Sequence, residues 1–318
     1  MSDLTLRFPV TTLDNRELLP EGTVVSDDVL RDLARSSGGS PHRELPFLGN
    51  DTIRKDLFAY MRQDVYRQIF GEEEECGSLL SSMEQILVPT PVFDILFHFR
   101  RNEGYTYRHI LIVSALTCLF GLSLAQNFRD VLLEASAGPL HDLGKISVPL
   151  EMLRISRPLR RTERAYLEHH AIAGFVLLGY YLGDSRKFPC VVARDHHERK
   201  DGSGYPRGIR LADRLVEIVV ACDVYDALIS SRPYRKRSYD NRTAIEEITK
   251  MAEEGKVGWD IVQFLVSRNR KERPPREECA VSEEKRGIPP EGNLYGIVLE
   301  DDDPVRDKPG PGGDKLPV

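Results

Sequence analysis

Candidate metal ligands recur at a regular interval along the middle of this chain. They are His109, His141, His170, His196 and Asp223. Each interval between successive positions is about one helix-turn-helix unit. A bundle in which every helix delivers one inward side chain to a shared metal centre produces this spacing. The pattern therefore predicts a mainly α fold, and the scarcity of stretches that alternate with period two supports the same prediction.

The most informative single stretch runs from His196 to Pro206. Two adjacent histidines, His196 and His197, and Glu198 lead directly into an Asp-Gly turn and then into Gly-Tyr-Pro. Neutral imidazole is the commonest metal ligand among side chains. Asp-Gly and Gly-Tyr-Pro are typical of a tight loop with special backbone angles. Alone, the stretch is compatible with a surface turn beside two ordinary histidines. Together with the other motifs it favours a metal-binding helix end followed by a rigid loop. Glu198 is expected to orient an imidazole, with an exposed charge as the alternative.

A second cluster, His141 to Lys145, contains residue types suited to phosphoryl chemistry. Histidine and aspartate together suit Fe, Mn or Zn. A carboxylate such as that of Asp142 can bridge two metals, and two metals roughly 3.5–4 Å apart can activate a water and clamp a phosphodiester. Lys145 is placed to neutralise a phosphate oxygen, with room left by Gly144. The alternative for Lys145 is an ordinary solvated lysine.

These motifs resemble a known family. His109, the pair His141-Asp142 and Asp223 look like the ligand set of the HD phosphohydrolase superfamily. Further stretches resemble its HD-GYP subfamily; they are His141 to Lys145, His170, His196 to Pro206, Asp223 to Leu228, and Arg232 to Arg235. The resemblance covers roughly residues 90 to 270, in the family's order. It implies a metal-dependent phosphodiesterase that hydrolyses cyclic di-GMP to pGpG, with GMP as a further product.

The resemblance also implies roles for individual residues. The metal ligands would be His109, His141, Asp142, His170, His196, His197 and Asp223. A His-x-x-x-Gly pattern completed by Gly174 favours His170 over His169 as a ligand. Arg232 and Arg235 match positions that hold the phosphates or guanine bases of the ligand, although such a basic run is ordinarily a solvated face. Tyr205 either packs the loop or contacts the ligand.

One position departs from the family pattern. Members with three metals carry a glutamate one helical turn before the first histidine, and this chain has Tyr105 there. Residues four apart share a helix face, so Tyr105 and not Glu103 is expected beside His109. We therefore expect two divalent metals, iron first and manganese as the alternative. The same departure puts the second hydrolytic step, to GMP, in doubt.

The expected architecture is mainly α, an HD-type helical bundle with a small N-terminal α/β element. Its divisions are a small N-terminal element (1–45), a helical connecting region (46–90), the catalytic domain (91–270) and a proline-rich charged tail (271–318). In the first, Leu18 to Val25 reads as a turn into a strand, and Ser26 as a helix N-cap. The run 294–299 predicts a strand that adds to the N-terminal element or to a partner, with irregular tail as an equal alternative.

Helices are expected at several places. The acidic stretch 72–75 is expected to be a non-helical segment between the first two helices. The expected ranges are 52–70, 79–99 with an interruption near Pro89 and Pro91, 109–126, 128–137, 162–182, 186–197, 211–230, 240–254 and 258–268.

Composition limits the cellular context. The formal net charge of −6 argues against broad nucleic-acid binding. Five scattered cysteines without a paired spacing are typical of reduced thiols in the cytoplasm. No signal peptide is recognised near Met1. The apolar run 110–125 is shorter than a typical span, so we expect a buried helix and no membrane partner.

Two other functions stay open at this stage. The same metal chemistry would serve another cyclic dinucleotide or a nucleotide monophosphate. A third hypothesis is a receptor that binds cyclic di-GMP, or a diguanylate cyclase (GGDEF) domain through the Gly-Tyr-Pro loop, with little turnover. A homodimer is also left open.

Overall fold

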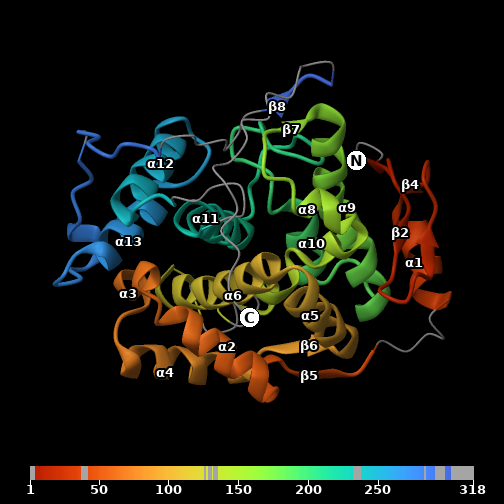
Figure 1. Ribbon diagram of the computed structural model, residues 1–318, viewed down its shortest axis with the longest axis horizontal. Helices are drawn as coiled ribbons and strands as arrows, with labels where there is room; N and C mark the ends of the chain where they lie inside the picture. The colour runs from red at the N-terminus through yellow and green to blue at the C-terminus, as the bar shows by residue number, and fades with distance from the viewer. Residues whose placement is uncertain are drawn as a thin grey trace, which may run out of the picture.

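The structure, a computed structural model, describes residues 4–36, 42–124, 127, 131, 135–231, 238–282, 284–290 and 298–301. Helices dominate it and surround α6 (Gly104–Leu124), which crosses the middle of the molecule in Figure 1. The mainly α prediction with a small N-terminal element is confirmed.

Helix α6 is central because nearly all its side chains are apolar or small. From Thr106 to Cys118 the described side chains are buried apart from that of Arg108. By length and composition α6 could cross a membrane, and it is the one such helix among the described residues. Most of it, however, is buried inside the protein. The core helix of a globular protein has the same composition.

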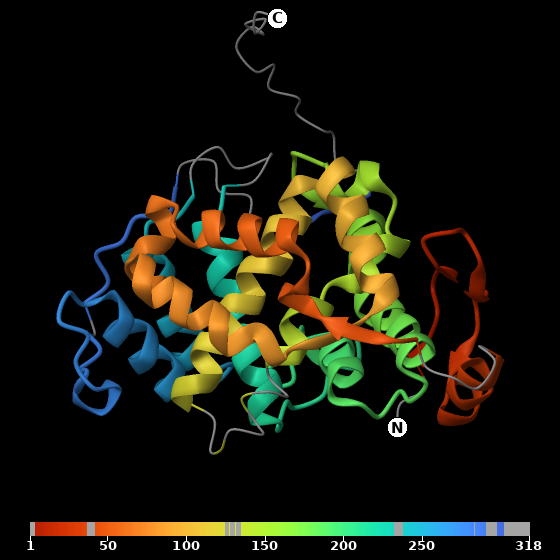
Figure 2. The ribbon, with the colours of Figure 1, turned by 90° about the horizontal axis from the view of Figure 1, so that it is seen from below.

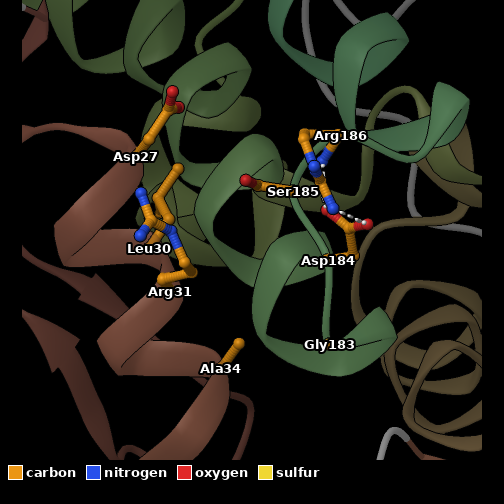
Figure 3. A pocket seen from close by; sticks show the side chains of 8 residues that line it. All are labelled: Asp27, Leu30, Arg31, Ala34, Gly183, Asp184, Ser185 and Arg186. Carbon is orange, nitrogen blue, oxygen red and sulfur yellow. Dashed lines mark hydrogen bonds and ion pairs between the residues drawn. The ribbon is translucent and has the colours of Figure 1, made fainter.

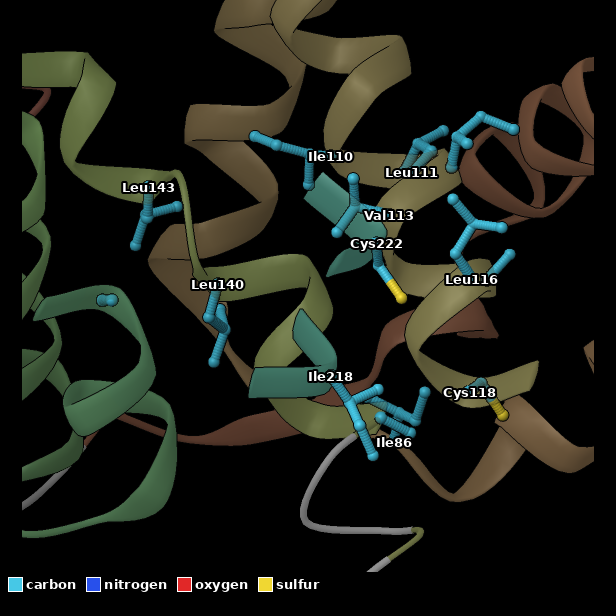
Figure 4. Packing of buried hydrophobic residues seen from close by; sticks show 14 of the residues in the cluster. Ile86, Ile110, Leu111, Val113, Leu116, Cys118, Leu140, Leu143, Ile218 and Cys222 are labelled. Carbon is cyan, nitrogen blue, oxygen red and sulfur yellow. The ribbon is translucent and has the colours of Figure 1, made fainter. Parts of the chain in front are cut away.

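Other helices pack around α6. On one side lie α5 (Thr90–Asn102) and α2 (Asp51–Met61), and on another lies α11 (Arg214–Ile229). Figure 4 shows side chains of α6 such as Val113 and Leu116 in the same cluster as Ile218 and Cys222 of α11. The remaining helices are α3 (Asp64–Phe70), α4 (Glu73–Ser82), α8 (Leu150–Leu153), α9 (Arg161–Leu182), α10 (Phe188–Asp195), α12 (Asn241–Glu253) and α13 (Trp259–Asn269).

Short 3-10 turns, labelled η, connect the helices at several points. The two that matter for the site are η3 (Gly138–Leu140) against α6 and η4 (Leu143–Ser147) against α9. The others are η1 (Phe47–Gly49), η2 (Met83–Gln85) and η5 (Arg276–Glu278).

The N-terminal element stands beside α9 (Figure 2). Strand β1 (Leu4–Thr5) pairs antiparallel with β4 (Val24–Val25), and β2 (Val10–Thr11) pairs with β3 (Glu17–Leu19). Helix α1 (Asp27–Ser36) follows, with the Ser26 hydroxyl accepting from the amide of Val29, as the sequence predicted. A hollow of about 450 Å³ lies between α1 and the turn after α9 (Figure 3); none of its lining residues is a predicted site residue.

Three predictions for the connecting region are wrong. The helix expected over 52–70 is two helices, α2 and α3, which are separated at Arg62 and Gln63. The acidic stretch starts a helix, because Glu72 and Glu75 form a capping box that satisfies the first amides of α4. The run 79–99 is not one helix: β6 (Leu87–Pro89) separates α4 from α5 and pairs antiparallel with β5 (Glu44–Pro46). Proline at the start of α5 is compatible with a first turn but not with a helix interior.

The predicted partner of the C-terminal strand is also wrong. Strand β8 (Val298–Leu299) pairs in parallel with β7 (Leu159–Arg160), directly before α9, and not with the N-terminal element. Asp301 then accepts hydrogen bonds from the amide and hydroxyl of Thr162 in the first turn of α9. The rest of that run lies outside the described residues, as does part of the helix expected over 128–137.

Candidate metal centre

The structure brings all seven predicted metal ligands together. His109 comes from α6, His141 and Asp142 from the turn between η3 and η4, and His170 from α9. His196 and His197 follow the end of α10, and Asp223 lies on α11. All are buried except His197 and Asp223, which are partly exposed. They form two groups, His109 with His141 and Asp142, and Asp142 with His170, His196 and His197.

The first group is rich in carboxylates. His109 Nε2 lies 3.4 Å from Asp142 Oδ2 and 3.1 Å from Asp223 Oδ1. His141 Nε2 lies 3.4 Å from the same Asp142 oxygen. Two imidazole nitrogens and two carboxylate oxygens therefore meet in a small volume.

The second group is rich in nitrogen. His170 Nε2 lies 3.3 Å from His196 Nε2 and 3.1 Å from His197 Nε2. Asp142 Oδ1 lies 3.3 Å from His170 Nε2 and 3.7 Å from His196 Nε2. Asp223 reaches this side only at 3.9 Å, from its Oδ2 to His197 Nδ1.

Asp142 connects the two groups. Its Oδ2 faces His109 and His141, and its Oδ1 faces His170 and His196. A carboxylate that divides its oxygens in this way can serve two cations at once. The arrangement is the one expected of a bridging ligand.

The backbone fixes which nitrogen of three of the imidazoles faces the centre. Nδ1 of His141 lies 2.7 Å from the carbonyl of Gly138, and Nδ1 of His196 lies 3.0 Å from that of Ala193. Nδ1 of His170 contacts the carbonyl of Leu167. A carbonyl only accepts, so each Nδ1 carries the proton and each Nε2 presents a lone pair inward. Metal-binding histidines are held in this way.

His109 is held differently, by a carboxylate. Its Nδ1 lies 2.6 Å from Oδ2 of Asp226, which is fully buried. Asp226 stands three residues after Asp223 on α11, so both face α6. In the sequence, Asp226 belongs to the stretch from Asp223 to Leu228, with no predicted role of its own. Its spacing from Asp223 was the signal that could have found it.

Electrostatics separates His109 from the other histidines, since burial lowers the pKa of His141 in the first group as well. Burial lowers the pKa of His109, but hydrogen bonds to Asp223 and Asp226 outweigh it and raise that pKa to about 9. Burial lowers the pKa of His170 to about 3 and that of His197 well below its usual value. Burial also opposes ionisation of Asp142, yet Lys145 and His141 hold its pKa well below the usual range. Neutral imidazoles and ionised carboxylates are the forms that bind metals.

The residues present fit a divalent metal. Nε2 of His141 is buried and makes no hydrogen bond. Nε2 atoms of His170 and His196 face each other as two lone pairs, which repel unless a cation lies between them. Histidine nitrogen with carboxylate oxygen, and no thiolate among the ligands, suits Fe, Mn or Zn.

The Gly-Tyr-Pro loop folds back on the histidine pair. A Cβ at Gly204 would lie 2.3 Å from the carbonyl oxygen of His197, so only glycine fits there. The ring of Tyr205 stacks on that of His197 at 4.5 Å, before a cis peptide bond to Pro206. Tyr205 thus covers one side of the second group, which leaves both predicted roles, packing and ligand contact, compatible with its position.

Both roles predicted for Glu198 are wrong, because the residue is fully buried and so is not an exposed charge. Its carboxylate orients no imidazole; it accepts from the amides of Arg207 at 2.7 Å and Ile209 at 3.1 Å. Arg207 also donates to Asp195 at 2.6 Å. Glu198 therefore closes the loop that carries Tyr205, a contact between residues that the spacing did not reveal.

The room predicted beside Gly144 is also absent. A Cβ there would lie 2.0 Å from the carbonyl oxygen of His170 and 2.3 Å from the amide of Gly174. Gly144 thus allows η4 to approach α9, and does not make space for a phosphate. Lys145 is partly buried and its ammonium pairs with Oδ2 of Asp142.

The remaining predictions concern residues near the centre. Tyr105 lies beside His109, with its ring nearly parallel at 5.8 Å, as predicted. Glu103 accepts from the amide of Thr106 at 2.6 Å and caps α6. His169 faces Phe8 of the N-terminal element, away from the ligand groups. Arg232 and Arg235 lie outside the described residues.

Comparison with known proteins matches the geometry. A family model described as HD domain matches residues 99–261. The chain is similar to a cyclic di-GMP phosphodiesterase response regulator of Xanthomonas campestris, with 34% identity over 140 residues, covering 42% of this chain and 36% of that protein. It is 30% identical over 172 residues to a cyclic di-GMP phosphodiesterase of Thermotoga maritima, covering 53% and 46%.

A third relative carries a different substrate in its name. It is 3′3′-cGAMP-specific phosphodiesterase 1 of Vibrio cholerae, 34% identical over 136 residues, covering 42% of this chain and 31% of that protein. The chain matches less than half the length of each of these three relatives.

Proposed function

We propose that this chain, which belongs to the HD domain family, is a metal-dependent phosphodiesterase of the HD-GYP type that hydrolyses cyclic di-GMP to pGpG. The observation that carries the proposal is the divided carboxylate of Asp142, with one oxygen toward each group of histidines. This arrangement supports two divalent metals. We propose iron first and manganese as the alternative.

Each of the seven ligand residues has a defined part in the proposal. The first metal would be held by His109, His141, Asp142 and Asp223. The second would be held by Asp142, His170, His196 and His197. When bound, two divalent metals supply Lewis-acid stabilisation of a phosphodiester and an activated water.

The chain's own groups would do the rest of the work. Lys145 pairs with Asp142 in the structure, at the edge of the centre. Its ammonium would turn toward a phosphate oxygen and stabilise the charge that develops there. Tyr205 would exclude water from one side of His197 and contact the nucleotide. Arg232 and Arg235 are proposed to bind its phosphates or guanine bases.

Another cyclic dinucleotide is the second candidate substrate. It is favoured by the similarity to a relative named for 3′3′-cGAMP. The two nucleotides differ in one base, so the metal chemistry would be unchanged and only the pocket would discriminate. GMP as a further product is kept within the proposal as an outcome to be measured.

The cellular location, a protein partner and the division of the chain into functional parts are also proposed. A soluble nucleotide substrate and reduced cysteines, all five of them buried, are consistent with the cytoplasm. Asp201 and Ser203 are exposed at the tip of the Gly-Tyr-Pro loop, which supports contact with a diguanylate cyclase domain there. Residues 46–90 and 91–270 would act as one catalytic unit, with 1–45 beside it and 271–318 as a tail.

The test is an anaerobic assay with Fe(II) or Mn(II). Purified protein is incubated with cyclic di-GMP and, separately, with 3′3′-cGAMP, metal per chain is quantified, and products are separated by chromatography. We expect about two metals per chain and conversion of cyclic di-GMP to pGpG. His170→Ala should abolish turnover. His98→Ala, which changes a histidine bonded only to Asn102 among the contacts described, should retain it.

Each alternative has its own result. Faster conversion of 3′3′-cGAMP would reassign the substrate. Metal-loaded protein that binds cyclic di-GMP and leaves it intact would make the chain a receptor. Protein that takes up no metal would contradict the metal centre itself.

A further inference from the structure

We propose that Tyr66, on α3, is a positioning residue of the metal centre that acts through Asp226 on His109. The inference rests on the metal-binding role proposed for His109. Helix α3 lies before residues 99–261, the part that matches the HD domain model. The connecting region would therefore supply part of the support that the metal centre needs.

The contacts form a continuous buried chain. The hydroxyl of Tyr66 donates to Oδ1 of Asp226, and Oδ2 of Asp226 lies 2.6 Å from Nδ1 of His109. Tyr66 and Asp226 are fully buried, and His109 is 1% exposed. Each oxygen of the carboxylate thus has one donor, and water has no access to either.

The direction of the hydrogen bond is fixed. Burial raises the pKa of Tyr66 well above its usual value, and the charge of Asp226 adds to this effect. The phenol therefore keeps its proton and can only donate to the carboxylate. With both oxygens engaged, Asp226 cannot rotate about its side chain, and its hold on His109 keeps Nε2 aimed at the first metal.

Helix α3 is itself anchored to the element that carries Asp226. Asn241 accepts from the hydroxyl of Tyr225 at 3.0 Å and donates to the carbonyl of Val65 at 3.3 Å. At the other end of α3, Arg268 donates to the carbonyl of Ile69 at 2.7 Å. These contacts hold the residues before and after Tyr66 in place, so the removal of its hydroxyl should leave the helix where it is.

The chain provides a matched control. Tyr107 is also buried, and its hydroxyl donates to a carboxylate, Oδ2 of Asp56, at 2.9 Å. Asp56 contacts Arg100 and no predicted metal ligand. Tyr66→Phe and Tyr107→Phe therefore delete the same group, a hydroxyl that donates to a carboxylate, and among the described hydrogen bonds only that of Tyr66 leads to His109. Asp56 is partly exposed whereas Asp226 is fully buried, and Tyr107 shares α6 with His109, so the control also reports any general effect of a lost hydroxyl on that helix.

The experiment measures metal affinity by competition with a chromophoric chelator, for the wild type and both variants. Outer partners of metal-bound histidines typically contribute about 10–100-fold to affinity. Tyr66 is one residue further from the metal than such a partner. We therefore expect Tyr66→Phe to lower the affinity for the metal that His109 would hold by about tenfold, and to leave the affinity for the other metal unchanged. Tyr107→Phe should match the wild type. Excess metal should restore turnover of Tyr66→Phe without a change in KM, which a merely structural defect would not allow.

A double-mutant cycle with Asp226→Asn tests the route. If Tyr66 acts through Asp226, the double variant should bind metal no more weakly than Asp226→Asn alone. Additive losses would overturn the proposed route. Equal affinities of Tyr66→Phe and wild type, or equal losses in both Tyr→Phe variants, would overturn the inference while leaving the metal centre intact. A wild type that binds no metal would overturn both proposals.

Discussion

The two halves of the candidate centre share Asp142 and differ in their balance of carboxylates and histidines. The first half pairs His109 and His141 with the carboxylates of Asp142 and Asp223. The second half sets three imidazoles against a single carboxylate oxygen. One half is therefore rich in negative charge and the other is rich in neutral nitrogen.

The difference shows how each half can be satisfied. In the first half a proton on His109 can take the place of a metal, because two carboxylates raise the pKa of His109 to about 9. In the second half burial lowers the pKa of His170 to about 3, so its Nε2 stays unprotonated at neutral pH. His141 of the first half also keeps a buried Nε2 without a hydrogen bond, so both halves offer nitrogen to a metal and only His109 holds a proton that a metal must displace.

Replacement of the shared ligand should have the largest effect. In Asp142→Asn the side chain keeps its shape and loses the charge and one acceptor oxygen. We expect loss of both metals and a fall in activity of more than about 100-fold, beyond the range of outer partners. Metal analysis and turnover measure this, with Asp184→Asn as the control because Asp184 pairs with Arg186 in a distant turn. Two metals per chain with full turnover would remove Asp142 from the centre.

Single-histidine variants should separate the two halves. His109→Ala should lose the metal of the first half, and His170→Ala that of the second, each leaving about one metal per chain. Elemental analysis after gel filtration gives the ratio. If either variant lost both metals, the two halves would bind cooperatively, and the comparison between them would need to include that coupling.

Proton release on metal binding should show the smallest effect. At pH 7, below the pKa of His109, a metal entering the first half must displace about one proton. Calorimetry of His170→Ala in buffers of different ionisation enthalpy should detect it, and His109→Ala should release none from this source. In the metal-free protein the protonated His109 stabilises the fold below its unfolded pKa. That contribution is lost as the pH rises toward about 9. Equal proton release in both variants would contradict the difference between the halves.

The seven candidate ligands could be predicted because their chemistry and spacing are visible along the chain and because the resemblance to the HD-GYP subfamily favoured His170 over His169. Histidine and aspartate at helical intervals indicate a shared centre whichever helices carry them. The predictions were wrong for residues whose contact partners no local sequence pattern indicates. Glu198 lies next to the histidine pair, yet its carboxylate binds two amides of the returning loop. Gly144 lies next to Lys145, yet the space above it is filled by α9.

The sequence by itself determined the mainly α fold, the ligand types and their order, because apolar periodicity and ligand chemistry are local properties. Only the tertiary structure decided which oxygen of Asp142 faces which histidines and which nitrogen of each imidazole points inward. It alone brought Tyr66 to Asp226, across 160 residues of chain. Such contacts are set by the packing of helices against one another. No local sequence pattern predicts that two residues far apart in the chain will be in contact.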